Sequence, residues 1–535
     1  MYKAYNLWQI ELSNDVDNAF ILDGVLNGFN IVDIDVPRPE KPIICKNYHS
    51  ATRKYCNLAE KQIQIEIDSA NYVITATPPD YVSALGAIPK PESSDIRLIH
   101  DLGRPMGGIN QYATETSVCY PSIENAVKSL PHDAYIAKID LKSAYRSVSI
   151  SPECYRLTGL QWLFKGSKVT TFISDTKLPF GAAKSCKIFQ TLTDSIVRMM
   201  ARRGFVVHGY LDDYLVQGKT ETECRQAYET LLQLLQDLGF QINYKKSVPP
   251  CQKLTFLGVV IDTINRVLEL PKNKLSELKR LVGTFLRKKS ATKLELQKLA
   301  GKLNWACKVV RGGRTFLRRI IDLSMSCKHV HHYVKLNKGA KEDIIWWATA
   351  LDIFHGFAQF PCDIPLPNYV FATDASMEGG AGHFLQDWFY VNWALDFPEQ
   401  RNKHITFLEL ETVVIAARRW GRHWHGLHIH VRSDNVACVA AINKSSSRSP
   451  ELMSLIRELF WLSVLYDFKI SASHIPGDLN FLADRLSRLN SLPHAIDAAN
   501  MLSTLCSYDT PLPLHMSYET YVYLQMLWRI HLKVY

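Results

Sequence analysis

The spacing of apolar residues along the chain predicts short strands alternating with amphipathic helices. Strands and turns are expected up to about residue 204, and residues 205–217 have the pattern of a β-hairpin. Residues 221–238 place leucines on one helical face, and Gly239 ends that helix. Pro271 begins a helical region, and after a proline-rich linker at 360–368 a strand-helix-strand pattern continues to about residue 489. The run 58–68 fits a helix or a strand.

Composition describes an ordinary globular protein with more than one domain. The chain has 535 residues, 47% hydrophobic and 21% charged, and single cores stop growing near about 250–300 residues. Its 12 cysteines form no Cys-x-x-Cys pair, so we expect reduced thiols. No stretch approaches the roughly 18 apolar residues of a membrane span, and the first residues lack the apolar core of a signal peptide. We therefore expect a cytoplasmic or nuclear protein without membrane contact.

Positive charge is concentrated in residues 272–335. This segment holds 17 Lys or Arg against three acids, a net +14, whereas the whole chain carries +10. A merely solvated surface would intersperse both signs, so the imbalance favours a polyphosphate partner. The residues expected to bind a nucleic-acid backbone are Lys288, Lys298, Lys302, Arg311, Arg314 and Arg318.

Three aspartates in strand-like surroundings form a first candidate site. Asp140 ends an apolar strand, and Asp212 and Asp213 lie inside the apolar stretch GYLDDYLV. Carboxylates in such places are costly unless a cation pairs with them. Mg²⁺ binds a few carboxylates together with substrate phosphates, and two such ions can stabilise both oxygens of a phosphoryl transfer. The three aspartates therefore predict a two-metal site.

Four further acids lie at the edges of predicted elements near the C-terminal end. Asp374 and Asp434 each end a strand, Glu409 lies in an amphipathic helix, and Asp484 lies in a final helix. Any one of them alone is explained as a helix cap or a surface charge. All four together favour a second metal site, with Glu411 as the alternative to Glu409.

The motifs around the first site resemble the palm of reverse transcriptases of the retroviral and long-terminal-repeat class. They are AKIDLKSAY at 137–145, LPFGAAKSCKIFQ at 178–190 and YLDDYLV at 210–216. The flanking segments RLIHD, GFQINYKK and LTFLG also resemble family segments and occur in the family's order. Two departures are Cys186, where the family usually has proline, and Phe180, where lentiviral enzymes have glutamine.

This resemblance implies roles for individual residues. Asp140, Asp212 and Asp213 correspond to the ligands of two Mg²⁺ ions, or of Mn²⁺ in their place. Tyr145 corresponds to an aromatic gate that excludes a ribose 2′-OH. The implied substrate-binding residues are Arg97, Tyr145, Gln190 and Lys245.

The second set of acids resembles the Asp-Glu-Asp-Asp quartet of retroelement ribonuclease H domains. That quartet binds two Mg²⁺ ions and directs water at an RNA phosphodiester, which makes Asp374, Glu409, Asp434 and Asp484 catalytic and metal-binding by resemblance. The family's Glu-Leu pattern favours Glu409 over Glu411. His474 is assigned to a His-x-Pro-Gly turn, and the catalytic histidine loop of cellular and retroviral enzymes has no clear counterpart.

The motif order implies an α+β fold, with a right-hand fingers-palm-thumb polymerase followed by an α/β ribonuclease H-like domain. The expected parts are an N-terminal extension (1–75), fingers and palm (76–265), a basic helical thumb and connection (266–365), ribonuclease H (366–490) and a tail without an assigned role (491–535).

The implied function is RNA-directed DNA synthesis with cleavage of the RNA strand of the hybrid. The expected partners are an RNA template, a DNA primer, the RNA–DNA hybrid and deoxynucleoside triphosphates. Sequence details lean towards a retroelement of the DIRS type, with the gypsy type second. The alternative is a domesticated or decayed retroelement copy that only binds nucleic acid.

Overall fold

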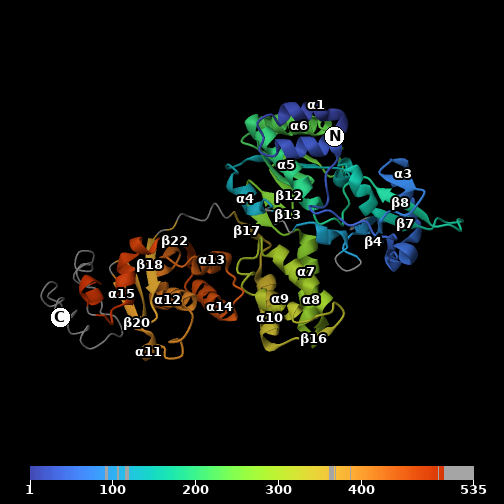
Figure 1. Cartoon of the computed structure of the whole chain (residues 1–535). Coiled ribbons are helices and arrows are strands. Elements are labelled where there is room, and N and C mark those ends of the chain that lie inside the picture. The colour runs from blue at the N-terminus through green and yellow to red at the C-terminus, as the bar shows by residue number, and fades with distance from the viewer. Residues whose placement is uncertain are drawn as a thin grey trace. The chain divides into compact units, whose positions relative to one another are not determined.

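The computed structural model describes residues 1–90, 94–104, 108–114, 118, 120–360, 367, 369–385, 387–491 and 493–498. The chain divides into two compact units, Met1–Val267 and Leu268–Tyr535 (Figure 1). Most of the predicted linker and most of the predicted tail lie outside the described residues. Within the described ranges, no helix is long and apolar enough to cross a membrane.

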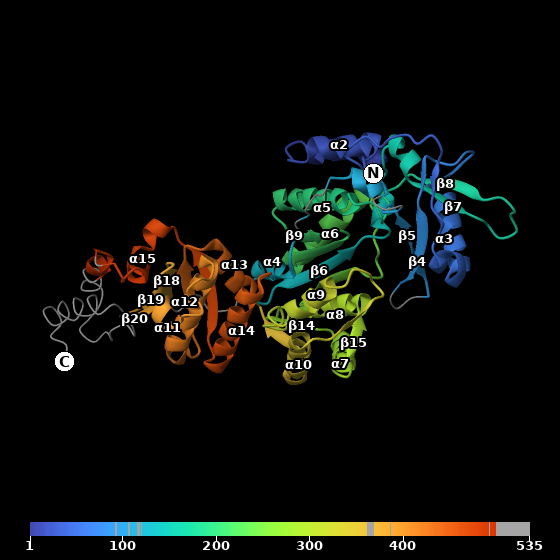
Figure 2. The same ribbon diagram turned by 60° about the horizontal axis from the view of Figure 1, so that its bottom comes forward.

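A four-stranded antiparallel sheet in the order β11-β6-β10-β9 forms the centre of the first unit. Its strands are β6 (Tyr135–Asp140), β9 (Val206–Tyr210), β10 (Asp213–Gly218) and β11 (Val248–Cys251). Helices α5 (Ser185–Arg202) and α6 (Glu221–Asp237) pack against this sheet (Figure 2). The predicted helix at 221–238 is confirmed: the Thr220 side chain caps its first turn, and Gly239 follows it with a φ of +94°.

The other strands of the first unit form a five-stranded sheet, β1-β3-β7-β8-β2, and two hairpins, β4-β5 and β12-β13. Their bounds are β1 Ile43–Ile44, β2 Tyr72–Thr75, β3 Tyr81–Val82, β4 Ala84–Pro89, β5 Ile96–Asp101, β7 Gly159–Trp162, β8 Thr171–Asp175, β12 Lys253–Phe256 and β13 Val259–Asp262. The run 58–68, which fitted a helix or a strand, lies within helix α3 (Cys56–Asp68). This helix packs on β2. The short helix α4 spans Ile123–Lys128.

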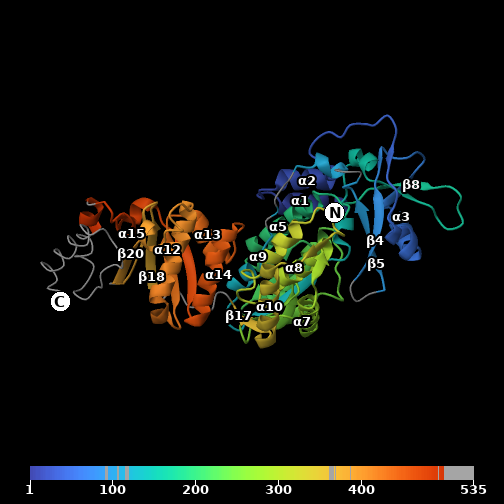
Figure 3. The same cartoon turned by 90° about the horizontal axis from the view of Figure 1, so that it is seen from below.

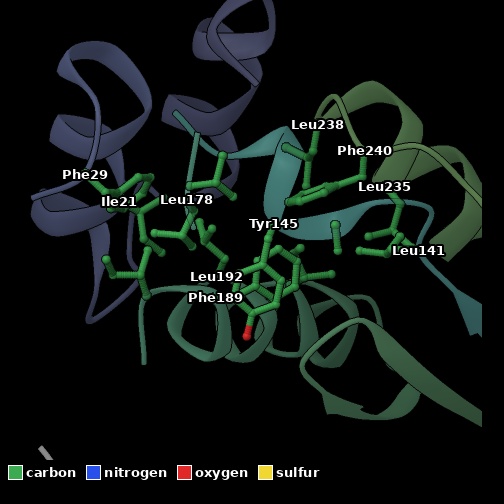
Figure 4. Packing of buried hydrophobic residues seen from close by; sticks show 14 of the residues in the cluster. Ile21, Phe29, Leu141, Tyr145, Leu178, Phe189, Leu192, Leu235, Leu238 and Phe240 are labelled. Carbon is green, nitrogen blue, oxygen red and sulfur yellow. The ribbon is translucent and has the colours of Figure 1, made fainter. Parts of the chain in front are cut away.

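Residues 1–75 belong to this unit and do not form a separate extension. Helices α1 (Tyr5–Glu11) and α2 (Asn18–Asn27) bury apolar side chains in the same core as α5. The Trp8 side chain is fully buried, and its indole N–H donates to the Leu238 carbonyl oxygen at 3.2 Å. Figure 4 shows Ile21 beside Phe29 and Leu178 in this cluster. The predicted boundary at residue 75 therefore differs from the structure, because the N-terminal helices share one core and one compact unit with α5.

Helices dominate the beginning of the second unit. They are α7 (Lys272–Leu286), α8 (Lys293–Ala306), α9 (Arg318–Met325) and α10 (Lys338–Ile353). Short strands accompany them: β14 Val267–Glu269, β15 Ser290–Thr292, β16 Tyr333–Lys335 and β17 Phe357–Gln359. Pro271 precedes α7 as predicted, and Thr292 and Glu295 form a capping box at the start of α8.

A five-stranded sheet in the order β20-β19-β18-β21-β22 follows. It is antiparallel from β20 to β18 and parallel from β18 to β22. The strands are β18 Tyr369–Ala375, β19 Gly379–Phe384, β20 Asp387–Asn392, β21 His428–Ser433 and β22 Lys469–His474. The helices are α11 Trp393–Asp396, α12 Ile405–Trp420, α13 Val436–Lys444, α14 Pro450–Leu465 and α15 Phe481–Ser487. Helices α12 and α14 pack side by side (Figure 3).

An aromatic junction, made of Phe316, Trp346 and Phe460, joins the helices of the second unit to α14. The rings of Phe316 and Trp346 stack with their centroids 4.2 Å apart, and Phe460 meets Phe316 edge-on at 5.2 Å. Beside them the fully buried Asp343 carboxylate lies 3.6 Å from the guanidinium of Arg457. The helices and the sheet of this unit therefore share one packed interface.

Candidate active sites

The first candidate site is built on the hairpin of β9 and β10, whose turn consists of Leu211 and Asp212. Leu211 has a φ of +51°, a conformation that a branched side chain rarely adopts. Helix α5 holds this turn from below. Gln190 Oε1 accepts from the Leu211 N–H at 2.9 Å, and Thr193 Oγ1 donates to the Leu211 carbonyl oxygen at 2.7 Å. The strained backbone is therefore fixed by side chains from another element.

This hairpin brings together the three aspartates that the sequence singled out. Asp213 lies directly opposite Asp140 in the antiparallel pairing of β10 with β6. Burial raises the pKa of Asp140 and of Asp212, and the Asp213 charge also raises both. The Asn243 amide donates to Asp140 Oδ1 at 2.7 Å, and Lys138 Nζ lies 2.9 Å from Asp213 Oδ1. Lys246 Nζ also lies 3.9 Å from Asp140 Oδ2, so cations as well as carboxylates border this site.

A cavity of about 710 Å³ opens beside these carboxylates. Its lining includes Asp140 and Asp212 and three of the predicted substrate-binding residues, Arg97, Tyr145 and Lys245. Gln190, the fourth, is only 2% exposed and is not among the lining residues. Its amide bonds the hairpin backbone and Asp194. The structure thus gives Gln190 the role of positioning the turn and leaves it no surface for a substrate.

The second candidate site lies where β18, α12 and the end of β21 meet. Carboxylate oxygens of Asp374, Glu409 and Asp434 lie within 4.8 Å of one another. They line a cavity of about 630 Å³. Burial, and then the charges of Asp434 and Asp484, raise the pKa of Asp374 to about 7, and burial next to Asp374 raises that of Glu409 well above its ordinary value. Ser487 Oγ donates to Asp374 Oδ2 at 2.6 Å.

The structure separates Glu409 from Glu411. Glu409 Oε1 accepts from the Ala375 N–H at 3.1 Å, which points its carboxylate at the cluster. Glu411 is equally buried but faces Arg418, whose guanidinium donates to it at 3.2 Å. The geometry therefore favours Glu409 as a member of the site.

Asp484 lies apart from the cluster of three. Its carboxylate accepts from Arg485 at 2.7 Å and from Arg488 at 3.0 Å. Two guanidinium groups therefore occupy the oxygens that the resemblance assigned to a metal. Arg488 lies four residues after Asp484, so its contact follows from helical spacing, whereas Arg485 is the next residue along the chain.

Several residues at the two sites had not been singled out from the sequence. At the first site they are Lys138 and Asn243, and at the second they are Arg488, Ser491 and His494, which line the cavity. Asn243 lies within GFQINYKK, a stretch that resembles a family segment, so the sequence did contain a pattern that could have pointed to it. The segment with Ser491 and His494 follows the last recognised motif and carried no signal.

The six predicted nucleic-acid-binding cations differ in their surroundings. Three are paired with acids: Lys288 with Glu295, Lys302 with Glu277 and Arg318 with Asp322. The other three, Lys298, Arg311 and Arg314, are exposed and have no acidic partner in the part of the chain that the structure describes. Those three are therefore the cations most available to a phosphate backbone.

Solved structures of reverse transcriptases share this fold. The foamy viral protease-reverse transcriptase in complex with double-stranded DNA is 18% identical, with a TM-score of 0.50, over 84% of this chain and 87% of that one. The same kind of enzyme in complex with an RNA/DNA hybrid is 17% identical, with a TM-score of 0.51, over 83% of this chain and 56% of that one. This likeness defines an α+β fold consistent with a polymerase followed by a ribonuclease H-like domain.

Sequence comparisons identify the kind of domain that part of this chain contains. Residues 88–261 match the family described as reverse transcriptase (RNA-dependent DNA polymerase), so the chain contains a reverse transcriptase domain of the kind found in retroviral and retroelement polyproteins. The Gag-Pol polyprotein of gibbon ape leukemia virus is 28% identical over 37% of this chain and 12% of that protein. The enzymatic polyprotein of cauliflower mosaic virus (strain CM-1841) is 24% identical over 58% of this chain and 44% of that protein. The chain thus spans less than half the length of these relatives.

Proposed function

We propose that the chain is an RNA-directed DNA polymerase that also carries ribonuclease H activity and copies retroelement RNA into DNA. The observation that carries the proposal is the strained turn in which Asp212 precedes Asp213, the strand partner of Asp140, while Asp140 and Asp212 line a cavity of about 710 Å³. The match of residues 88–261 to the reverse transcriptase family supports the same activity.

At the first site we infer roles for the three aspartates and for three of the residues that line the cavity. The carboxylates of Asp140, Asp212 and Asp213 would hold two Mg²⁺ ions, or Mn²⁺ in their place, since neighbouring carboxylates that raise one another's pKa favour a divalent cation. Bound there, the ions would supply charge stabilisation for phosphoryl transfer. Arg97 and Lys245 offer cations to a triphosphate, and the Tyr145 ring excludes a ribose 2′-OH from the sugar position.

At the second site we infer hydrolysis of the RNA strand. Asp374, Glu409 and Asp434 form a three-carboxylate cluster that could hold a divalent ion, and two such ions would serve phosphodiester hydrolysis. Asp484 would join them as a ligand after exchanging its arginine partners for a metal. Arg488 lines the same cavity and so offers a cation to the scissile phosphate once it leaves Asp484.

The partners follow from the chemistry of the two sites. An RNA template, a DNA primer and deoxynucleoside triphosphates would occupy the first site, and the RNA–DNA hybrid would reach the second. The exposed cations Lys298, Arg311 and Arg314 would contact the phosphate backbone. The subtype, DIRS type ahead of gypsy type, stays a prediction that rests on the sequence motifs.

The test is a pair of assays on the full chain: primer extension on an RNA template, and cleavage of a labelled RNA–DNA hybrid, both with Mg²⁺. We expect Asp212→Asn to abolish synthesis and leave cleavage intact, and Asp434→Asn to do the reverse. The reason is that each reaction depends on its own carboxylate cluster.

Two matched controls accompany these variants. Asp237→Asn changes an exposed acid on α6 and should alter neither reaction, and Glu411→Gln changes a buried acid on α12 outside the cluster. Loss of both activities in either active-site variant would contradict independent sites. A wild-type chain that binds hybrid but catalyses neither reaction would instead establish the non-enzymatic alternative.

A further inference from the structure

The nucleotide cavity of the first unit contains a continuous stack of four planar groups, Arg97, Phe180, Tyr145 and Phe189. The Arg97 guanidinium lies over the Phe180 ring, 5.4 Å from its centroid. The Phe180 ring faces Tyr145 at 4.8 Å with an interplanar angle of 30°. Tyr145 in turn stacks on Phe189 at 5.0 Å and 16° (Figure 4). The stack runs from a cation on β5 to the buried core beneath α5.

Exposure changes steadily along this stack. Phe189 is fully buried and Tyr145 is 6% exposed, whereas Phe180 is 45% exposed at a position that lines the cavity with Asp140 and Asp212. A half-exposed ring adds little to a core. The Phe180 ring instead contacts both the predicted sugar gate, Tyr145, and the predicted triphosphate contact, Arg97.

The backbone next to Phe180 is fixed in place. A Cβ at Gly181 would lie 1.7 Å from the carbonyl oxygen of His100 on β5, so only glycine permits this approach. The Gly181 carbonyl oxygen also accepts from the Asn110 amide at 2.9 Å. The backbone beside Phe180 is therefore held against the strand that carries Arg97.

We propose that Phe180 is the positioning residue that couples phosphate binding to sugar selection in this site. Its ring holds the Arg97 guanidinium by a cation–π contact and the Tyr145 ring by stacking, so both groups keep one orientation. This inference rests on the proposed polymerase function and adds a specificity determinant to it. The Tyr145 hydroxyl, which donates to Cys186 Sγ at 3.5 Å, fixes the other end of the gate.

The test compares a non-aromatic with an aromatic replacement of Phe180 in the full chain. Phe180→Leu should raise the KM for deoxynucleotides and lower the preference over ribonucleotides, each by roughly three- to tenfold, since one aromatic pair and one exposed cation–π contact are lost. The kcat at saturating deoxynucleotide should change less than about twofold, because no group of the carboxylate cluster is altered. Phe180→Tyr should restore both values.

A double-substitution cycle tests the coupling directly. Arg97→Lys keeps the charge but loses the planar group. Its effect on KM should therefore be small when Phe180 is already leucine and larger in the protein that keeps Phe180. Phe172→Leu removes a half-buried ring on β8 outside the cavity lining and serves as the matched control. Additive effects of Arg97→Lys and Phe180→Leu, or equal effects of Leu and Tyr at position 180, would overturn the proposal.

A second readout does not depend on catalysis. Cys186 is exposed, and its thiol accepts from the Tyr145 hydroxyl, so a loosened gate should raise the rate at which iodoacetamide alkylates Cys186. Peptide mass spectrometry should show this increase in Phe180→Leu but not in Phe180→Tyr or Phe172→Leu. If the wild-type chain makes no DNA, the polymerase function fails while this measurement still decides the positioning role. An unchanged alkylation rate in Phe180→Leu would refute that role.

Discussion

Replacing Asp374 by asparagine should stabilise the metal-free protein while removing its response to Mg²⁺. Asp374 is 3% exposed, and burial together with the charges of Asp434 and Asp484 raises its pKa to about 7. In the unfolded chain the same carboxyl titrates near about 3.9. Asparagine has nearly the same shape, keeps an oxygen to accept from Ser487, and carries no charge.

The magnitude follows from the difference between the two pKa values. Between about pH 4 and pH 7 the folded state holds a proton that the unfolded state has lost, so stability falls as the pH rises. The fall is about 1.4 kcal/mol per pH unit, or roughly 1.5 kcal/mol by pH 5 and about 4 kcal/mol by pH 8. Asp374→Asn removes this loss, so the difference between its free energy of unfolding and that of the wild type should grow with pH.

Amide hydrogen exchange of β18 and α12 in the full chain, with chelator, measures this local stability at pH 5 and pH 8. Adding Mg²⁺ at pH 8 should protect these elements strongly in wild type and weakly in Asp374→Asn. Glu411→Gln is the control, since Glu411 lies outside the cluster and its variant should keep the wild-type response to Mg²⁺. An advantage of Asp374→Asn that is absent at pH 8, or equal at both pH values, would refute the reasoning.

Two further predictions concern the first site and the basic helices. Gln190→Ala should lower the rate of primer extension at least tenfold with little change in the KM for deoxynucleotides, because it frees the Leu211 turn without touching the nucleotide; a rise in KM alone would instead make Gln190 a substrate contact. Replacing Lys298, Arg311 and Arg314 by alanine should reduce the slope of log affinity against log salt by up to about 2.7, at roughly 0.9 per lost duplex-phosphate contact. Titrations between low and moderate salt measure this slope, and an unchanged slope would show that these cations only solubilise the surface.

Asp374, Glu409 and Asp434 could be singled out from the sequence because each is a charged residue in an apolar, strand-like or helical context, and the structure brings these three carboxylates together. Asp140 and Asp213 lie far apart in sequence, yet the strand patterns around them carried enough information to bring them together. The choice between Glu409 and Glu411 needed the structure. Residues two apart on a helix face nearly opposite directions, and only the packing of α12 shows which direction faces β18.

Other features of the fold and of the sites depend on long-range contacts that the local sequence pattern does not indicate. Gln190 matched a family motif and was predicted to bind substrate. In the structure it is buried beneath the hairpin, where its side chain accepts from the Leu211 N–H. The helices of residues 1–75 showed no motif, and their place in the core appears only through long-range packing such as that of Trp8. The arginines that bind Asp484 were visible in sequence, but their effect on its ligand role required side-chain positions.

The aromatic junction of Phe316, Trp346 and Phe460 determines where this chain can be divided for laboratory work. A fragment cut near residue 365 would expose these rings and leave the buried Asp343 carboxylate without Arg457, which is the kind of surface that aggregates on expression. A fragment that starts at Leu268 keeps the junction intact. A fragment that carries the ribonuclease H-like fold should therefore include the basic helices, and the proposed nuclease activity and hybrid binding could then be tested on a single piece.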